Sequence, residues 1–118
     1  MVLITERNET LSEIYGRLLS RAGYNTVVMK SAEESSAYID NGSDDVEFLV
    51  LCLKSPAEAE RLLVEKFGKR FPGRRVFLLV DEMTEEVRAF IDEHNIDACL
   101  TKPFLPSDLL KRISLFFY

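Results

Sequence analysis

Short apolar runs alternate along the chain with longer segments in which apolar residues recur every three or four positions. The runs are rich in aliphatic and β-branched residues, a composition typical of strands, and they cover residues 2–5, 26–29, 48–53, 76–80 and 98–101. Each segment that follows a run has the amphipathic spacing of a helix, as at Leu11, Ile14 and Leu18. The pattern therefore predicts five strands and five helices in strict alternation.

Several helix boundaries are marked by capping residues. Thr10 with Glu13, and Ser31 with Glu34, have the spacing of a capping box, in which a hydroxyl and a carboxylate each accept a backbone N–H. Gly23 follows the first amphipathic segment, where a left-handed residue commonly ends a helix. These signals predict that the first two helices begin close to Thr10 and Ser31.

The central runs are apolar at nearly every position, as strands of a parallel sheet are when helices cover both faces. With right-handed crossovers, five βα units form an open, doubly wound α/β fold. Sites in such folds lie beyond the carboxyl ends of the strands. The residues to examine are therefore Glu6 and Arg7, residues 52–56, Val80 and Asp81, and residues 101–103.

Composition narrows the functional classes. The 118 residues fit one domain over residues 1–118, either a whole protein or a piece of a longer one. A net charge of −5 argues against nucleic-acid binding, and no apolar run approaches the length of a membrane span. No signal peptide is evident, and two cysteines within apolar runs suggest buried thiols in a reducing compartment. We expect a cytoplasmic protein.

Five stretches resemble one family. Similarity to response-regulator receiver domains of the CheY-like superfamily is found in VLITERNE at 2–9, AGY at 22–24, FLVLCLKSP at 48–56, VFLLVDE at 76–82 and especially CLTKPF at 99–104. The resemblance spans the chain and implies a flavodoxin-like (βα)5 fold with strand order 2-1-3-4-5 and a role in bacterial two-component signalling. In that family an aspartate after the third strand takes a phosphoryl group, two acids hold Mg²⁺, a hydroxyl and a lysine contact the phosphoryl group, and an aromatic residue reports the switch.

The positions that match this machinery are mostly altered. They hold Glu6, Arg7, Cys52, Val80, Cys99, Lys102 and Pro103. Cys52 stands where the phosphoacceptor aspartate is expected, and Arg7 replaces one of the two acids. Glu6, Arg7 and Lys102 sum to a formal charge of about +1, whereas Mg²⁺ requires several oxygen ligands. We therefore expect no catalytic residues, no metal and no cofactor. Lys102 is expected to pair with Glu6. Arg7 is expected either to fill the former metal site or to turn outward.

Two alternative hypotheses involve a covalent modification of the domain. Arg7 and Lys102 would lower the pKa of Cys52 and favour a redox-responsive thiol, although a cysteine in an apolar run commonly packs as a small hydrophobe. The other alternative is phosphorylation at a substitute site, Asp81.

Other chemistry around the cysteines is disfavoured. The only histidine, His94, is expected to cap the end of another helix. A Cys52–Cys99 disulfide would have to cross two strand spacings of about 4.8 Å each, beyond the span of a disulfide.

Binding of another protein remains as the function. In receiver domains the fourth helix, fifth strand and fifth helix commonly carry dimer or output contacts. The chain ends with Leu115, Phe116, Phe117 and Tyr118, and a short last helix buries only some of them. The sequence therefore predicts an atypical receiver domain, or pseudo-receiver. It would act through protein–protein contacts with an output domain, another protein or a second copy, with Phe116, Phe117 and Tyr118 on the contact face.

Overall fold

Five parallel strands form a single sheet at the centre of the molecule, in the order β2-β1-β3-β4-β5. The computed structural model describes residues 1–42, 45–102 and 104–117, with side chains as far as residue 115. The strands are β1 (Val2–Thr5), β2 (Thr26–Met29), β3 (Phe48–Leu53), β4 (Arg75–Val80) and β5 (Ala98–Thr101). Both the fold and the strand order implied by the resemblance are confirmed.

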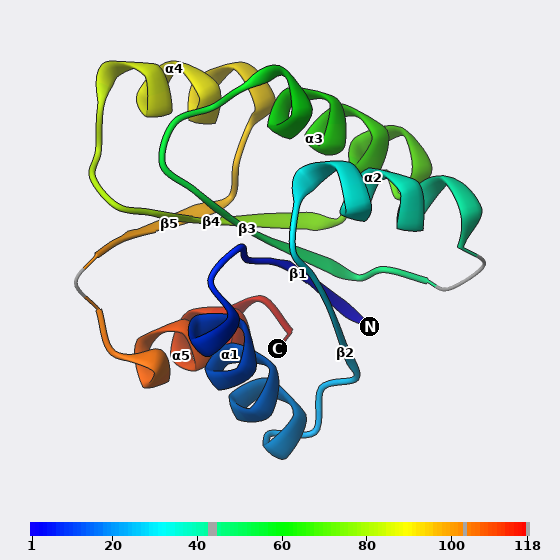
Figure 1. The fold of residues 1–118 in the computed structure, drawn as a ribbon, viewed down its shortest axis with the longest axis vertical. Coiled ribbons are helices and arrows are strands. Elements are labelled where there is room, and N and C mark those ends of the chain that lie inside the picture. Colours follow the sequence, from blue (N-terminus) through cyan, green and yellow to red (C-terminus); the bar gives the residue numbers. More distant parts are fainter. Residues whose placement is uncertain (43–44, 103, 118) are drawn as a thin grey trace.

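Helices cover both faces of the sheet. α1 and α5 lie on one face, and α2, α3 and α4 lie side by side on the other (Figure 1). Their bounds are α1 (Glu9–Arg21), α2 (Ala32–Asn41), α3 (Glu58–Arg70), α4 (Glu85–His94) and α5 (Pro106–Phe117). None of these helices, within the residues described, is long and apolar enough to cross a membrane.

The predicted start of the first helix is wrong by about two residues. The N-cap of α1 is Asn8, whose side chain accepts the Leu11 N–H at 3.0 Å, so Thr10 lies inside the helix. Asparagine is as good an N-cap as threonine, and it comes first along the chain. Ser31 caps α2 as predicted, by accepting the N–H of Glu34 at 3.1 Å. The left-handed residue expected after α1 is present at Gly23, with φ 96°.

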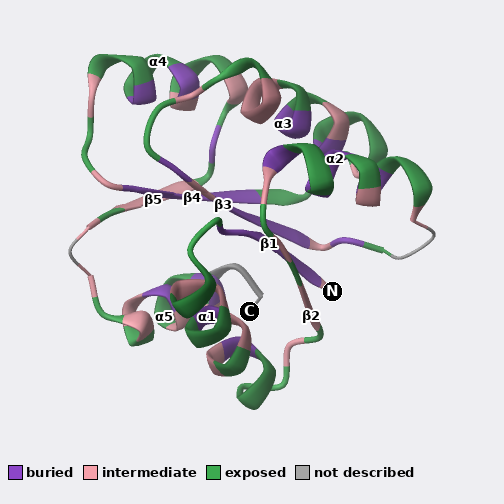
Figure 2. Cartoon of the chain, in the orientation of Figure 1, coloured by how far each residue is buried: buried purple, intermediate pink, exposed green. Residues whose placement is uncertain are grey.

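The core has two layers, one on each side of the sheet. β3 and β4 lie in the middle, and most of their residues are buried (Figure 2). Alternate residues of these strands point to opposite faces, so Phe77 and Leu79 pack toward α1 and α5, whereas Leu78 and Val80 pack toward the other helices. This two-sided burial accounts for the continuous apolar runs in the sequence.

A buried polar contact ties α2 to β1. The hydroxyl groups of Thr5 and Ser35 lie 2.7 Å apart, and both side chains are buried. Burial of a hydroxyl is unfavourable unless it forms a hydrogen bond, and each of these satisfies the other. The pair fixes the first turn of α2 beside the carboxyl end of β1, at the margin of the candidate site.

Candidate functional site

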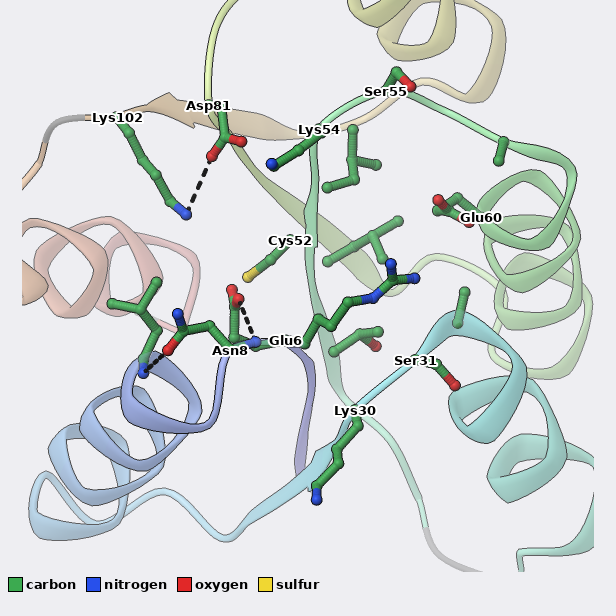
Figure 3. Close-up of a pocket in the computed structure, with 17 residues that line it drawn as sticks. Glu6, Asn8, Lys30, Ser31, Cys52, Lys54, Ser55, Glu60, Asp81 and Lys102 are labelled. Atoms are coloured by element: carbon green, nitrogen blue, oxygen red, sulfur yellow. Dashed lines mark hydrogen bonds and ion pairs between the residues drawn. The ribbon is translucent and has the colours of Figure 1, made fainter.

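A cleft of about 640 Å³ opens at the carboxyl edge of the sheet. Residues that directly follow each of the five strands line it (Figure 3): Glu6 and Arg7 after β1, Lys30 and Ser31 after β2, Lys54 and Ser55 after β3, Asp81 after β4 and Lys102 after β5. Cys52, near the end of β3, also contributes to the lining. The cleft is thus where a parallel sheet of this kind is expected to have its site.

The structure brings together four of the seven positions selected from the sequence. Glu6, Arg7, Cys52 and Lys102 line the cleft. The side chains of Val80 and Cys99 instead pack in the core layer beneath α2, α3 and α4. Pro103 lies outside the described residues.

Glu6 is a buried carboxylate with one oxygen engaged. It is only 5% exposed, and its Oε1 accepts the Asn8 N–H at 3.1 Å. Its Oε2 is buried and has no conventional hydrogen-bond partner in the described part of the chain. The Cys52 sulfur is directed toward this carboxylate (Figure 3), and a thiol is only a weak hydrogen-bond donor. The carboxylate therefore retains capacity to accept a further hydrogen bond.

The environment of Cys52 favours the neutral thiol. Burial raises the pKa of Cys52 well above its ordinary value, and the negative charge of Glu6 and its interaction with the thiol raise it further. Lys102 acts in the opposite direction, but its effect is smaller than that of burial. The lowered pKa that nearby cations would give a reactive thiol is therefore not found, because desolvation outweighs them.

Lys102 pairs with Asp81 and not with Glu6, which corrects the pairing expected from the sequence. Its Nζ lies 3.2 Å from Asp81 Oδ1, and the two side chains are 33% and 39% exposed. The Lys102 N–H donates to the Val80 carbonyl at 2.9 Å. This bond places Lys102 directly beside the end of β4, where Asp81 is the next residue, so Asp81 is the carboxylate within its reach.

Arg7 is exposed and lines the cleft, so its guanidinium is not buried in a former metal site. Sequence reasoning missed the cation Lys30 and included Lys54 only as a member of residues 52–56. Lys30 pairs with Glu9 at 3.1 Å, and Lys54 is exposed at the upper margin of the cleft (Figure 3). Lys30 directly follows β2, so the rule that selected Glu6 and Arg7 could have found it as well.

The two cysteines lie on opposite faces of the sheet. Cys52 packs with the layer beneath α1 and α5, and Cys99 packs with the layer beneath α2 to α4. β4 separates their strands, and both thiols are free. The expectation that they do not form a disulfide is confirmed, and the opposite orientation of the side chains adds a second reason to the strand spacing.

His94 belongs to α4 and is not part of the cleft lining. Its ring packs against Phe90 with 4.8 Å between centroids. The residue that caps α4 is Asn95, in the left-handed conformation with φ 52°. His94 therefore lies in the last turn of α4, where the sequence placed it as a basic residue at a helix end, and the adjoining Asn95 provides the left-handed cap.

The last helix buries one stripe of its surface. Leu109 and Ile113 are fully buried, whereas Leu115 is 72% exposed and Leu105, just before the helix, is 67% exposed. The predicted contact residues Phe116, Phe117 and Tyr118 lie outside the described side chains. The exposed leucines show that apolar surface is present at both ends of α5.

The donor set of the cleft does not fit a divalent metal ion. Mg²⁺ prefers several carboxylate oxygens and water in octahedral geometry. Here one oxygen of Glu6 is taken by a backbone N–H, Asp81 is held by Lys102, and Cys52 offers a neutral thiol. Throughout the described residues, no group of three or more histidine, cysteine, aspartate or glutamate side chains could hold a metal ion.

Comparisons with known proteins identify the fold. No protein-family model matches the sequence, and neither does any curated protein. Solved structures do match. A CheY-like response regulator receiver domain protein from Methanospirillum hungatei is 26% identical, with a TM-score of 0.83 over 96% of this chain and 89% of that one. The chemotaxis protein CheY4 of Vibrio cholerae is 18% identical, with a TM-score of 0.80 over 96% and 94%.

A third similar structure is an orphan response regulator of H. pylori, 20% identical, with a TM-score of 0.79 over 97% of this chain and 92% of that one. The chain therefore has the receiver-domain fold of two-component response regulators along nearly its whole length. These likenesses concern the backbone and show nothing of the chemistry of the cleft.

Proposed function

We propose that the protein is a pseudo-receiver, which signals through protein–protein contacts without aspartyl phosphorylation, bound Mg²⁺ or catalysis of its own. The main support for this proposal is that the thiol of Cys52 occupies the position that would hold the phosphoacceptor. Burial and Glu6 raise its pKa, so the group is neutral at physiological pH. A neutral thiol supplies neither the carboxylate nucleophile nor a hard metal ligand.

The ion pair between Lys102 and Asp81 supports the same proposal. Phosphoryl transfer relies on positioned cations that neutralise the charge developing on the phosphoryl group. In this cleft the lysine already has a carboxylate partner at 3.2 Å. The cation that would contact a phosphoryl group is thus engaged within the domain, and the β4 and β5 ends are connected without any modification.

We propose that the partner binds where α4, β5 and α5 form one side of the molecule. Leu105 and Leu115 are both more than half exposed there, and exposed aliphatic residues are suitable anchors for a protein contact. The partner is an attached output domain, a separate protein, or a second copy in a homodimer. A cytoplasmic location follows from the proposed role, with no nucleic acid or membrane bound by this domain.

Incubation with acetyl phosphate and Mg²⁺, followed by intact mass measurement, tests the proposal. The expected result is an unchanged mass. The matched control is the double variant Arg7→Asp with Cys52→Asp, which restores the carboxylates at the edge of the sheet. It is expected to gain the mass of one phosphoryl group in the same assay, so that an unchanged mass for the natural chain reflects its residues. Addition of one phosphoryl group to the natural chain would overturn the proposal.

The mass assay tests one alternative, and a partner-binding measurement tests the other. If Asp81 were the acceptor, the mass increase would disappear in Asp81→Asn. If Cys52 were a redox sensor, oxidation would change partner binding in the natural chain and leave Cys52→Ser unaffected. The raised pKa of Cys52 disfavours the second alternative, because the thiolate is the reactive form.

A further inference from the structure

Three exposed cations on α1 and α5 have no anionic partner. Arg17 and Arg21 are about one turn apart on α1, and Lys111 lies in the middle of α5. Among the residues that the structure describes, none of the three forms an ion pair. A cation in the last turn of a helix stabilises its dipole, which accounts for Arg21 but not for the other two.

The cations of the two helices lie close in height. α1 and α5 are neighbours on one face of the sheet (Figure 1), and because both follow strands of a parallel sheet they run in the same direction. The hydroxyl oxygens of Tyr24 and Ser114 lie 3.4 Å apart and fix the register of the helices. Arg21 precedes Tyr24 by three residues, and Lys111 precedes Ser114 by three, so these two cations are at similar levels.

The two sides of α1 differ in character. The side near β2 is marked by Ser20, whose hydroxyl oxygen lies 2.7 Å from that of Thr26. With 3.6 residues per turn, Ile14 and Arg21 lie on the side of the helix turned away from β2, where α5 lies, whereas Glu13 lies on the side near β2. A positive and partly apolar side of α1 therefore adjoins α5.

The other acidic residues of these two helices are engaged. Glu9 pairs with Lys30 at 3.1 Å. Asp108 accepts the N–H of Leu105 at 3.0 Å through its Oδ2. The three positive charges between the two helices thus lack local compensation, in a chain whose net charge is −5.

Exposed apolar side chains accompany the cations. Ile14 is 39% exposed and lies three residues before Arg17. Leu115 is 72% exposed and lies four residues after Lys111. Residues three or four apart are neighbours on a helix surface, so each helix offers an apolar side chain directly beside a cation.

The α1–α5 surface consists of Ile14, Arg17, Arg21, Lys111 and Leu115. We propose that this surface binds an acidic amphipathic helix of another protein, whose apolar stripe packs on the two aliphatic residues and whose flanking carboxylates pair with the three cations. Helices with apolar anchors every three or four residues commonly dock on other helices in this way. Nucleic acid is a poorer match, because three cations on a chain of net charge −5 give little attraction for a polyanion.

The α1–α5 surface extends beyond the contact face of the proposed function. Leu115 belongs to both, whereas the residues on α1 belong only to the new surface. The proposed function does not require this second contact, and its acetyl phosphate assay is independent of it.

An NMR titration of the backbone amides with a synthetic helix tests the inference. The probe is a peptide of about 16 residues, with leucines at helical spacing on one face and glutamates on both flanks. A second peptide has glutamine in place of every glutamate. At about 1 mM the glutamate peptide is expected to shift amide signals of α1 and α5, and the shifts decrease as salt is added. The glutamine peptide is expected to bind at least about fivefold more weakly.

A triple variant removes the positive charges of the surface. Arg17→Gln, Arg21→Gln and Lys111→Gln together are expected to weaken binding of the glutamate peptide at least about tenfold, since each exposed ion pair contributes a factor of about two to five. All three side chains are exposed, so the fold is expected to be retained, which thermal unfolding checks. Lys69→Gln, at an exposed position of α3 on the opposite face of the sheet, is the matched control and leaves affinity unchanged.

Five results would overturn the inference. Three concern the peptides: no shifts in α1 and α5 with the glutamate peptide, equal affinity for the glutamine peptide, or unchanged affinity in the triple variant. The fourth is binding of a short DNA duplex at physiological salt that the triple variant loses, which would assign the surface to nucleic acid. The fifth is self-association of the chain that the triple variant loses, which would assign it to a second copy.

Discussion

Lys102 Nζ and Asp81 Oδ1 lie 3.2 Å apart across the ends of β5 and β4. The lysine is the one cation at the edge of the sheet that the resemblance assigns to phosphoryl contact, and here it is held by the residue that follows the adjacent strand. The pair is about one-third exposed on each side, so water and salt weaken its Coulomb attraction. The pair therefore matters more for the position of the Lys102 side chain than for the free energy of unfolding.

A double-mutant cycle measures this pair. Asp81→Ala, Lys102→Ala and the double variant are expected to give a coupling energy below about 1 kcal/mol in the free energy of unfolding, as for other partly exposed ion pairs. Urea denaturation provides the measurement. Glu82→Ala, at an exposed neighbouring position, is the control and is expected to show no coupling to Lys102. A coupling of several kcal/mol would contradict this account.

Thiol alkylation tests the environment of Cys52. Because burial and Glu6 raise its pKa, the thiolate fraction at neutral pH is small, and iodoacetamide is expected to modify it at least about tenfold more slowly in the native protein than in urea. Peptide mapping by mass spectrometry separates Cys52 from Cys99, whose pKa burial also raises. Equal rates for Cys52 in native and unfolded protein would favour the redox-responsive alternative.

The same groups make stability depend on alkaline pH. A group whose pKa is raised by folding stabilises the native state at pH values below its unfolded pKa, and this contribution is lost as the pH rises. For Cys52 the loss begins near the ordinary value of 9.0. Tyr15, whose pKa is also raised, chiefly by burial, adds to it above the ordinary value of 10.0. In this window each such group lowers the free energy of unfolding by about 1.4 kcal/mol per pH unit.

Cys52→Ala is expected to remove the part of the alkaline decrease in the free energy of unfolding that comes from Cys52. Urea denaturation at a series of pH values from about 8 to 11 should give a shallower decline for the variant than for the natural chain, by about 1.4 kcal/mol per pH unit at most. The slope and not the absolute stability is the quantity to compare, because the substitution also changes packing. Parallel curves for the two proteins would show that Cys52 ionises alike in both states.

The hydroxyl pair between β1 and α2 predicts a non-additive result. Ser35→Ala leaves the buried Thr5 hydroxyl without its partner at 2.7 Å and is expected to cost about 1–3 kcal/mol. Thr5→Val in the same chain removes the unsatisfied group and should recover part of that loss. Ser36→Ala, next in the helix, is the control and should cost less. Strictly additive effects would argue against the pair.

Local sequence determined the elements, and the resemblance implied their order in the sheet. The apolar runs predicted β1, β2, β3 and β5 at their observed bounds, and β4 to within one residue. Continuous apolar strands require a sheet covered on both faces, and the resemblance supplied the order β2-β1-β3-β4-β5. The start of α1 was misplaced because Asn8 and Thr10 are both acceptable N-caps, and propensity alone does not choose between them.

The candidate site was only partly predictable. The rule that function lies after the carboxyl ends of parallel strands selected Glu6, Arg7, Cys52 and Lys102, and the structure places all four in one cleft. The sequence did not reveal which carboxylate Lys102 would reach, nor that burial would outweigh nearby cations at Cys52. Pairing and desolvation depend on distances between loops far apart in the chain. Those distances exist only once the sheet has brought the five strand ends to a common edge, so tertiary structure alone decided the charge state of the cleft.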